Sequence, residues 1–240
     1  MHQDCEKSIQ FIVCPQRDFI GRDAEAASNR LHVGAAAIGR LRGSGGGTDP
    51  FVETIRLLFD DSVPGTEQLQ VVVEEDWHPR SCEEFPIFGE HCLKGSHGAE
   101  LAGGLEQFRW HPRTHVVRAN SLNIAAVPSY RRLMKRLVGA SRPEAIRVGV
   151  FGVWTHIKVE YLLLNLRTLY PSFPQLAVCE PLCASPREDD HRHAMSKFRD
   201  LGYQVFEEIE GYLVWLGIDP ERVAVLSRKL RPAGEKIAAH

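Results

Sequence analysis

Side chains that can do nucleophilic, acid–base or ion-pairing chemistry follow directly after the apolar segments of this 240-residue chain. Cys14 comes at the end of the first apolar run, and Asp76 follows shortly after a run of three valines. Arg118 ends a third apolar run, and Lys158 comes soon after a fourth, which ends in Gly152. A thiol, a carboxylate and an amine are group types that general acid–base and nucleophilic catalysis use. Their shared place after apolar runs is the reason to look for one common site.

The apolar runs predict β-strands that alternate with amphipathic helices. We expect strands over 8–14, 69–73, 114–118, 147–152, 176–179 and 203–206, and helices over 35–41, 51–59, 130–138, 155–168, 189–201, 209–216 and 220–230. This alternation indicates an α/β fold, a three-layer α/β/α (Rossmann-like) arrangement with a central, mostly parallel sheet. Ligands bind such sheets beyond the carboxyl ends of the strands, at the point where the strand order switches. We therefore expect the reactive side chains to meet at that edge.

The composition is that of an ordinary globular protein, with 43% hydrophobic and 25% charged residues. A formal net charge of -2 gives no broad basic face, so we expect no nucleic acid and no membrane surface as partner. The amino-terminal residues lack the basic and apolar regions of a secretory signal. The six cysteines show no tight paired spacing, which favours reduced thiols and a cytoplasmic location.

A single domain is expected over 1–240, with a glycine-rich insertion at about 21–66 and a loose tail after Pro232. The glycine run at 43–48 predicts a mobile loop. The segment 77–106 is rich in Pro, Gly, His and Cys, and predicts a long functional loop with short helical turns. One reading of the insertion is a surface that binds a partner protein.

Five short motifs occur in order along the chain. They are C-P-Q-R-D-F at 14–19, D-W-H-P at 76–79, H-C-L-K-G-S-H-G-A-E at 91–100, G-V-W-T-H-I-K-V at 152–159, and C-A-S with H-R-H-A-M at 183–195. Together they resemble the nicotinamidase and isochorismatase superfamily of cysteine hydrolases, outside the divergent stretch from about 21 to 66. The resemblance implies the α/β fold already predicted, and small-molecule substrates. It also implies a homo-oligomer, because members of the family often form dimers or tetramers.

The resemblance further implies a nucleophilic cysteine at a helix start, an aspartate base at the end of the first strand, and a lysine beside them. Here the nucleophile position holds Lys158 and the aspartate position holds Cys14. The lysine position holds Ala119, or Arg118 if the alignment shifts by one residue. The usual triad is therefore replaced, and an acyl-enzyme on a cysteine at position 158 is excluded.

Three hypotheses follow for the replaced triad. In the first, the chain is a pseudoenzyme that keeps a small-molecule pocket. In the second, Cys14 is the nucleophile of an amide hydrolase, and the ammonium of Lys158 lowers the pKa of its thiol. In the third, burial and the positive helix end lower the pKa of Lys158 itself, which then forms a Schiff base.

The resemblance also implies a metal site. Asp76, His78 and His91 match the positions that bind a divalent metal in nicotinamidase-like proteins. One carboxylate and two imidazoles suit zinc, iron or manganese, with positions left for water that could act in hydrolysis. The alternative is that both histidines are loop residues that make hydrogen bonds, and a cationic Lys158 nearby would oppose a metal.

The remaining pocket residues have plainer alternatives. Trp77 and Trp154 either wall the pocket or simply pack, and His156 either faces the pocket or lies exposed near the helix start. Thr155 is predicted to cap the helix that carries Lys158. Either residue of the Glu74-Glu75 pair is a candidate partner for Lys158, and His191 is expected on a surface helix.

Overall fold

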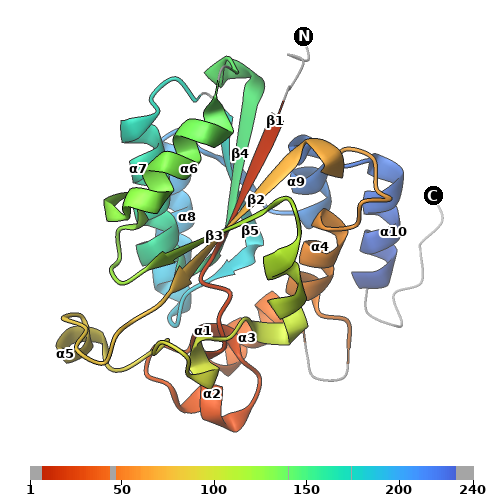
Figure 1. Ribbon diagram of the computed structural model, residues 1–240. Helices are drawn as coiled ribbons and strands as arrows, with labels where there is room; N and C mark the ends of the chain where they lie inside the picture. Colours follow the sequence, from red (N-terminus) through yellow and green to blue (C-terminus); the bar gives the residue numbers. More distant parts are fainter. Residues whose placement is uncertain (1–6, 44–46, 140, 174, 231–240) are drawn as a thin grey trace.

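The computed structural model describes residues 7–43, 47–139, 141–173 and 175–230. Within them, six strands form one parallel sheet in the order β3-β2-β1-β4-β5-β6 (Figure 1). The strands are β1 (Lys7–Val13), β2 (Leu69–Asp76), β3 (Thr114–Ala119), β4 (Ile146–Val153), β5 (Gln175–Ala184) and β6 (Gln204–Phe206). The predicted three-layer α/β/α fold is confirmed, and the sheet is parallel throughout. The strand order switches between β1 and β4, where such sheets bind ligands.

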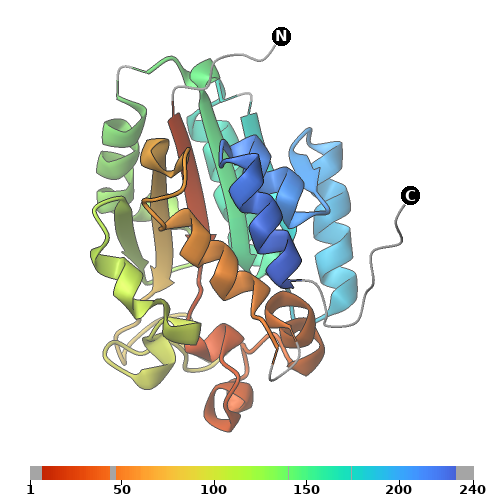
Figure 2. The same cartoon turned by 90° about the vertical axis from the view of Figure 1, so that its right-hand side faces the viewer.

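Six of the described helices cover the two faces of the sheet. On one face lie α6 (Pro128–Val138), α7 (Glu160–Leu169) and α8 (Glu188–Asp200), and on the other lie α4 (Pro50–Leu58), α9 (Ile209–Leu216) and α10 (Pro220–Leu230) (Figures 1 and 2). The central strands are buried on both faces, as shown by the adjacent residues Phe11 and Ile12 of β1 and Val150 and Phe151 of β4, which point to opposite faces and are all buried. This double coverage explains why the strands are continuous apolar runs rather than alternating ones.

Short helices gather beyond the carboxyl ends of the strands (Figure 1). They are α1 (Arg17–Ile20), α2 (Ala24–Ser28), α3 (Ala35–Arg42) and α5 (Phe85–Phe88). Tighter or wider helical turns occur at η1 (Thr66–Gln68), η2 (His97–Ala99), η3 (Ala102–Trp110), η4 (Ile124–Ala126), η5 (Pro143–Ala145) and η6 (Thr155–Val159). The predicted loop at 77–106 thus contains short helical turns, and it lies at the end of the sheet that positions the site.

The expected insertion at 21–66 contains ordered helices. Asp49 begins α4 by accepting a hydrogen bond from the Val52 amide at 3.1 Å, and its other oxygen pairs with Arg42 at 2.7 Å. The glycine run at 43–48 falls partly outside the described residues, at 44–46, and the tail after Pro232 lies wholly outside them.

Across the described parts of the chain, none of the helices combines the length and the apolar character that crossing a bilayer requires.

Candidate functional site

The register of the sheet decides which strand-end side chains share a face. Successive residues of a strand point to opposite faces, so Glu74 and Asp76 of β2 lie on one face and Glu75 on the other. Asp76 pairs with Ala119 of β3, and Glu75 pairs with Arg118. Ala119 therefore shares a face with Asp76, whereas Arg118 belongs to the opposite face with Glu75.

A close approach of two strands directs the chain into the site. Gly152 of β4 lies opposite Val13 of β1 and has a φ of 134°, and a Cβ there would lie 2.1 Å from the Val13 carbonyl oxygen. Only glycine fits this approach. The chain then enters the π-helical turn η6, and this turn carries Lys158 toward the ends of β1 and β2.

The ammonium of Lys158 is the centre of a buried ion-pair cluster. Its Nζ donates to Asp76 Oδ1 at 2.5 Å and to the Ser121 carbonyl oxygen at 3.0 Å, and lies 3.5 Å from Glu74 Oε1. Burial by itself would lower the pKa of Lys158, but the carboxylates of Asp76 and Glu74 outweigh it and hold that pKa above its ordinary value. A protonated amine has no lone pair, so this direction is the opposite of the one that a Schiff-base lysine needs.

The two carboxyl groups beside Lys158 respond differently to burial. Burial would raise the pKa of Asp76, but the ammonium of Lys158 holds it well below its ordinary value. Burial raises the pKa of Glu74 to about 7, because Lys158 compensates only in part. The prediction that Glu74 or Glu75 pairs with Lys158 is confirmed for Glu74.

Cys14 lies at the end of β1 in the same cluster. It is fully buried, has a φ of 47°, and its amide donates to the Glu74 carbonyl oxygen at 2.9 Å. Burial raises the pKa of its thiol well above the ordinary value, and the charge of Asp76 adds to this more than Lys158 opposes it. A thiolate nucleophile at Cys14 requires a shift in the other direction.

Asp76, His78 and His91 converge on one point, and we call them the inner group. Asp76 Oδ2 lies 3.7 Å from His78 Nε2 and 3.6 Å from His91 Nε2, and all three side chains are buried. Atoms this close can share one ion at metal–ligand distances of about 2.0–2.2 Å. The three residues named from the sequence as metal ligands are therefore adjacent in space, in a group that could hold a metal ion.

The contacts of Nδ1 in both histidines favour metal binding at Nε2. His91 Nδ1 lies 2.9 Å from the Gly89 carbonyl oxygen, which can only accept, so Nδ1 carries the proton and Nε2 presents a lone pair. His78 Nδ1 lies 3.2 Å from Cys82 Sγ, and its buried Nε2 has no hydrogen-bond partner. With His78 also protonated on Nδ1, two lone pairs face a carboxylate oxygen, and this donor set fits a divalent cation.

The structure does not bring Arg118 to this cluster. Its guanidinium lies 4.0 Å from the centre of the Trp77 ring, and its Nε lies 3.2 Å from Glu75 Oε2. The physical reason is the alternation along β3, which turns Arg118 away and leaves the buried Ala119 facing the cluster side. Ala119 adds no charge to the cluster.

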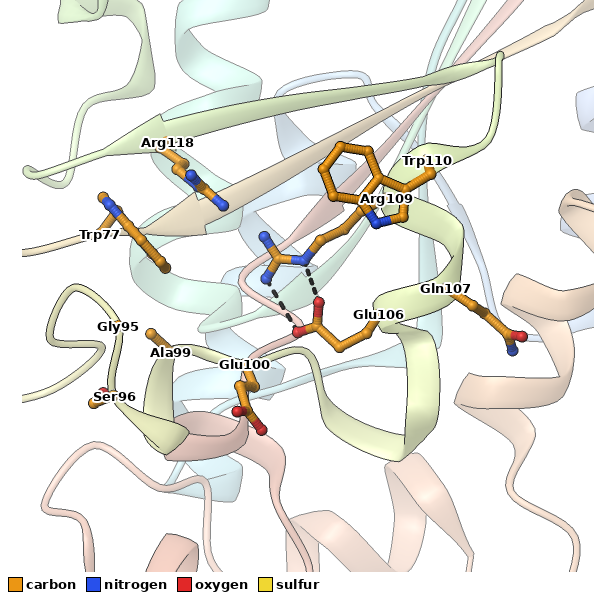
Figure 3. A pocket seen from close by; sticks show the side chains of 10 residues that line it. All are labelled: Trp77, Gly95, Ser96, Ala99, Glu100, Glu106, Gln107, Arg109, Trp110 and Arg118. Atoms are coloured by element: carbon orange, nitrogen blue, oxygen red, sulfur yellow. Dashed lines mark hydrogen bonds and ion pairs between the residues drawn. The ribbon is translucent and has the colours of Figure 1, made fainter.

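Trp77 and Arg118 instead line a surface hollow of about 670 Å³ on the other side of β3 (Figure 3). Trp110, which is 88% exposed, lies across the hollow from them, with Arg109 and Glu106 between. Trp77 thus belongs to a separate surface from that of Lys158.

In the segment 154–156, one residue lines the pocket and the other two support it. Trp154 lines the pocket, and its Nε1–H donates to the Leu31 carbonyl oxygen at 2.9 Å. Thr155 does not cap the helix: it lies inside η6, and its hydroxyl is 2.9 Å from Nδ1 of His191, a buried residue rather than a surface one. His156 stacks on Trp154 and bonds to Ser185 Oγ at 2.8 Å, so it supports the wall from outside.

The pocket over the cluster is small. Its cavity is about 20 Å³, which is room for about one water molecule. The polar lining residues are Asp76, Glu84, His91 and Lys158, and the apolar ones are Phe19, Leu31, Phe88, Leu122, Trp154 and Ile157. A larger ligand can enter only if side chains move.

Sequence reasoning gave no role to Gln16, which fixes the position of Asp76. Its amide group donates to the Asp76 carbonyl oxygen and accepts from the Asp76 amide, each at 2.7 Å. A third bond, to the Ala99 carbonyl oxygen at 3.1 Å, ties the loop after β2 to β1. The sequence signal for this role was the presence of a glutamine within the first motif, directly after a strand.

No protein-family model matches the chain, and no curated protein matches it. Solved structures do. A nicotinamidase/pyrazinamidase from Bacillus subtilis superposes with a TM-score of 0.64 at 19% identity, covering 84% of this chain and 100% of that one. A pyrazinamidase of Pyrococcus horikoshii in complex with zinc gives 0.61 at 16%, covering 84% and 99%. An isochorismatase-like hydrolase from Alkaliphilus metalliredigens gives 0.61 at 17%, covering 87% and 99%. This chain therefore has the fold of the nicotinamidases and isochorismatase-like hydrolases.

Proposed function

We propose that this chain is a divergent isochorismatase-like protein that binds a small molecule and does not act as a cysteine hydrolase. The observation that supports this most directly is the contact of 2.5 Å between Lys158 Nζ and Asp76 Oδ1. By the resemblance in sequence, position 158 corresponds to the nucleophilic thiol of the resembling enzymes, and here it holds an ion-paired ammonium. Acyl transfer through the protein requires an activated nucleophile in that place.

The neighbouring groups do not replace the missing nucleophile. The pKa of the Cys14 thiol is raised by burial, and Cys14 is fully enclosed. The carboxylate of Asp76 accepts from Lys158 on one oxygen and faces two histidines with the other. The Cys14 thiol is therefore held in its protonated form, and both oxygens of the Asp76 carboxylate already have polar neighbours.

The pocket walls indicate the class of ligand. Phe19, Phe88 and Trp154 offer flat apolar surfaces, and Lys158 and His91 offer polar contacts at one end. This combination fits a small planar molecule with one polar substituent. Binding must widen the cavity of about 20 Å³, and the side chains of Phe88 and Trp154 are only partly buried, so they can move outward.

The test combines turnover with binding. Metal-free protein is incubated with nicotinamide, pyrazinamide and other primary amides, and ammonia release is measured. Binding of the same amides and of their acids is measured by the shift in thermal unfolding. We expect no turnover, and binding that Lys158→Met alters. Lys197→Met is the matched control, because Lys197 is half exposed and pairs with Glu160 on the surface. Catalytic ammonia release by the metal-free protein would overturn the proposal.

A second candidate function is metal-dependent hydrolysis, and the inner group is the observation that favours it. Asp76 Oδ2 and the Nε2 atoms of His78 and His91 would hold the ion. The chemistry that a divalent ion supplies when bound is polarisation of a carbonyl group and activation of water. The ammonium of Lys158 would orient the substrate carbonyl, and its positive charge opposes the ion. Turnover that appears only with added Zn²⁺, Mn²⁺ or Fe²⁺, and that is lost in His91→Ala, would favour this function.

A further inference from the structure

A second set of metal-ligand atoms lies on the far side of the His78 ring, and we call it the outer group. It consists of His78, Cys82 and Glu84, which each offer one ligand atom within 4.8 Å of the other two. His78 Nδ1 and Cys82 Sγ are 3.2 Å apart. These residues come from one short segment between the end of β2 and α5, so the local chain path alone brings them together.

The outer group is open to ions from solvent. Cys82 and Glu84 are partly exposed, whereas the other cysteines of the described residues are buried. Glu84 Oε1 accepts from the Leu122 amide at 2.9 Å, which holds the carboxylate in place and leaves its second oxygen available. Within the ranges that the structure describes, Glu84 has no lysine or arginine partner, so its charge is uncompensated.

The donor types select the ion. A thiolate, an imidazole and a carboxylate suit zinc and other thiophilic divalent ions, with a fourth position left for water. Magnesium and calcium prefer oxygen donors and are disfavoured here. Cys82 Sγ also lies 3.8 Å from the Asn120 carbonyl oxygen, which gives the sulfur a second fixed neighbour.

The inner and outer groups share one imidazole, and this sets up a competition. A neutral imidazole has one lone pair, on Nε2 or on Nδ1. An ion on the inner group takes Nε2, and an ion on the outer group takes Nδ1. Asp76 of the inner group is already paired with the ammonium of Lys158 at 2.5 Å, whereas the outer group has no internal cation. The charge balance therefore favours the outer group.

We propose that a thiophilic divalent cation binds this chain at His78 Nδ1, Cys82 Sγ and Glu84, beside the pocket that Glu84 helps to line and in preference to the inner group. The site stands apart from the proposed function, because it needs neither turnover nor a bound small molecule. Bound there, the cation fixes the segment 78–84 beside the pocket that Glu84 helps to line.

The experiment is a titration of reduced, metal-free, full-length protein with Co²⁺, followed by near-ultraviolet absorption and native mass spectrometry. We expect one Co²⁺ per chain with a thiolate-to-cobalt charge-transfer band, and displacement of both by Zn²⁺. Cys82→Ser should abolish the band and weaken Co²⁺ binding by at least about tenfold, and Glu84→Gln should weaken it comparably. The matched control is His91→Ala, which removes an inner ligand and should leave the band unchanged.

The alternatives give distinct results. A band that disappears in His91→Ala would place the ion on the inner group and overturn the proposal, as would binding without a thiolate band. No binding at all would overturn it as well. As a second measurement, Zn²⁺ should protect Cys82 from alkylation, and unchanged labelling of Cys82 at saturating Zn²⁺ would contradict the site. Neither measurement depends on the pocket ligand, so failure here leaves the proposed function standing.

Discussion

Replacing Glu74 with glutamine should change how the stability of this protein depends on pH. Glu74 is 1% exposed, and both of its carboxyl oxygens lack a hydrogen-bond partner in the described part of the chain. Its nearest cation is the Lys158 ammonium at 3.5 Å from Oε1. Burial raises the pKa of Glu74 to about 7, with Lys158 opposing in part. The carboxyl group is therefore neutral in the folded chain over a range where it is ionised in the unfolded chain.

The sign and the size of the effect follow from that difference. The pKa is about 7 in the folded chain and 4.5 for an ordinary glutamate. Between these pH values the folded state holds a proton that the unfolded state has released, so rising pH favours unfolding. Stability from this group is fully present below pH 4.5 and is lost as the pH rises through 7. At about 1.4 kcal/mol per pKa unit, the loss across the window is about 3 kcal/mol.

The assay is urea unfolding from pH 4.5 to 8, followed by tryptophan fluorescence, on wild type and Glu74→Gln. The glutamine carries no titrating proton, so the variant should gain about 3 kcal/mol relative to wild type across the window. Glu221→Gln, on the exposed face of α10, is the control and should run parallel to wild type. Parallel curves for Glu74→Gln would refute the reasoning, because they would mean that Glu74 titrates alike in both states.

The remaining predictions concern the same end of the sheet. Lys158→Met should destabilise the fold by about 3–5 kcal/mol at neutral pH, because it leaves a buried carboxylate without a cation; urea unfolding measures this, and a loss below about 1 kcal/mol would contradict the buried pair. Among the cysteines of the described residues, Cys82 should be alkylated first in the native protein without metal, and Cys14 should react only on unfolding, because burial raises the pKa of the Cys14 thiol; mass-spectrometric mapping would contradict this if Cys14 labels rapidly below pH 8. Gly152→Ala should destabilise the fold by more than about 3 kcal/mol, because the new Cβ would lie 2.1 Å from a β1 carbonyl oxygen; unchanged thermal unfolding would show that β1 and β4 can separate without loss.

Much of the sheet could be predicted because its strands are buried on both faces. Continuous apolar runs marked β1, β2 and β4, and the residues just after them converge as expected. The strand β5 runs to Ala184, beyond the predicted 176–179, because its register shifts along β4 and resumes at Cys183. A register shift of this kind leaves no local signal in the sequence.

The point that the sequence left open within the site and the point that it predicted wrongly have a common physical origin. Whether Arg118 or Ala119 faces inward depends on the phase of β3 against β2, which is decided by pairing and not by residue type. Thr155 is of a residue type that often caps helices, but its hydroxyl forms a hydrogen bond with His191, a residue far away in the sequence. Both outcomes depend on tertiary contacts that one segment does not reveal.

The amine at position 158 changes what the neighbouring carboxylate requires. A buried carboxylate is costly unless a cation pairs with it. If position 158 carried a neutral thiol, Asp76 would need another cation. A metal ion held by Asp76 Oδ2 and the two histidine nitrogens beside it would supply that charge. With Lys158, the cation is part of the chain and contacts Oδ1 directly. The inner group is then stable without an ion, and His78 is free to turn its lone pair to Nδ1. Under the two proposals made above, the amine at position 158 therefore has two effects: it leaves that position without a nucleophilic thiol, and it favours metal binding at the outer group over the inner group.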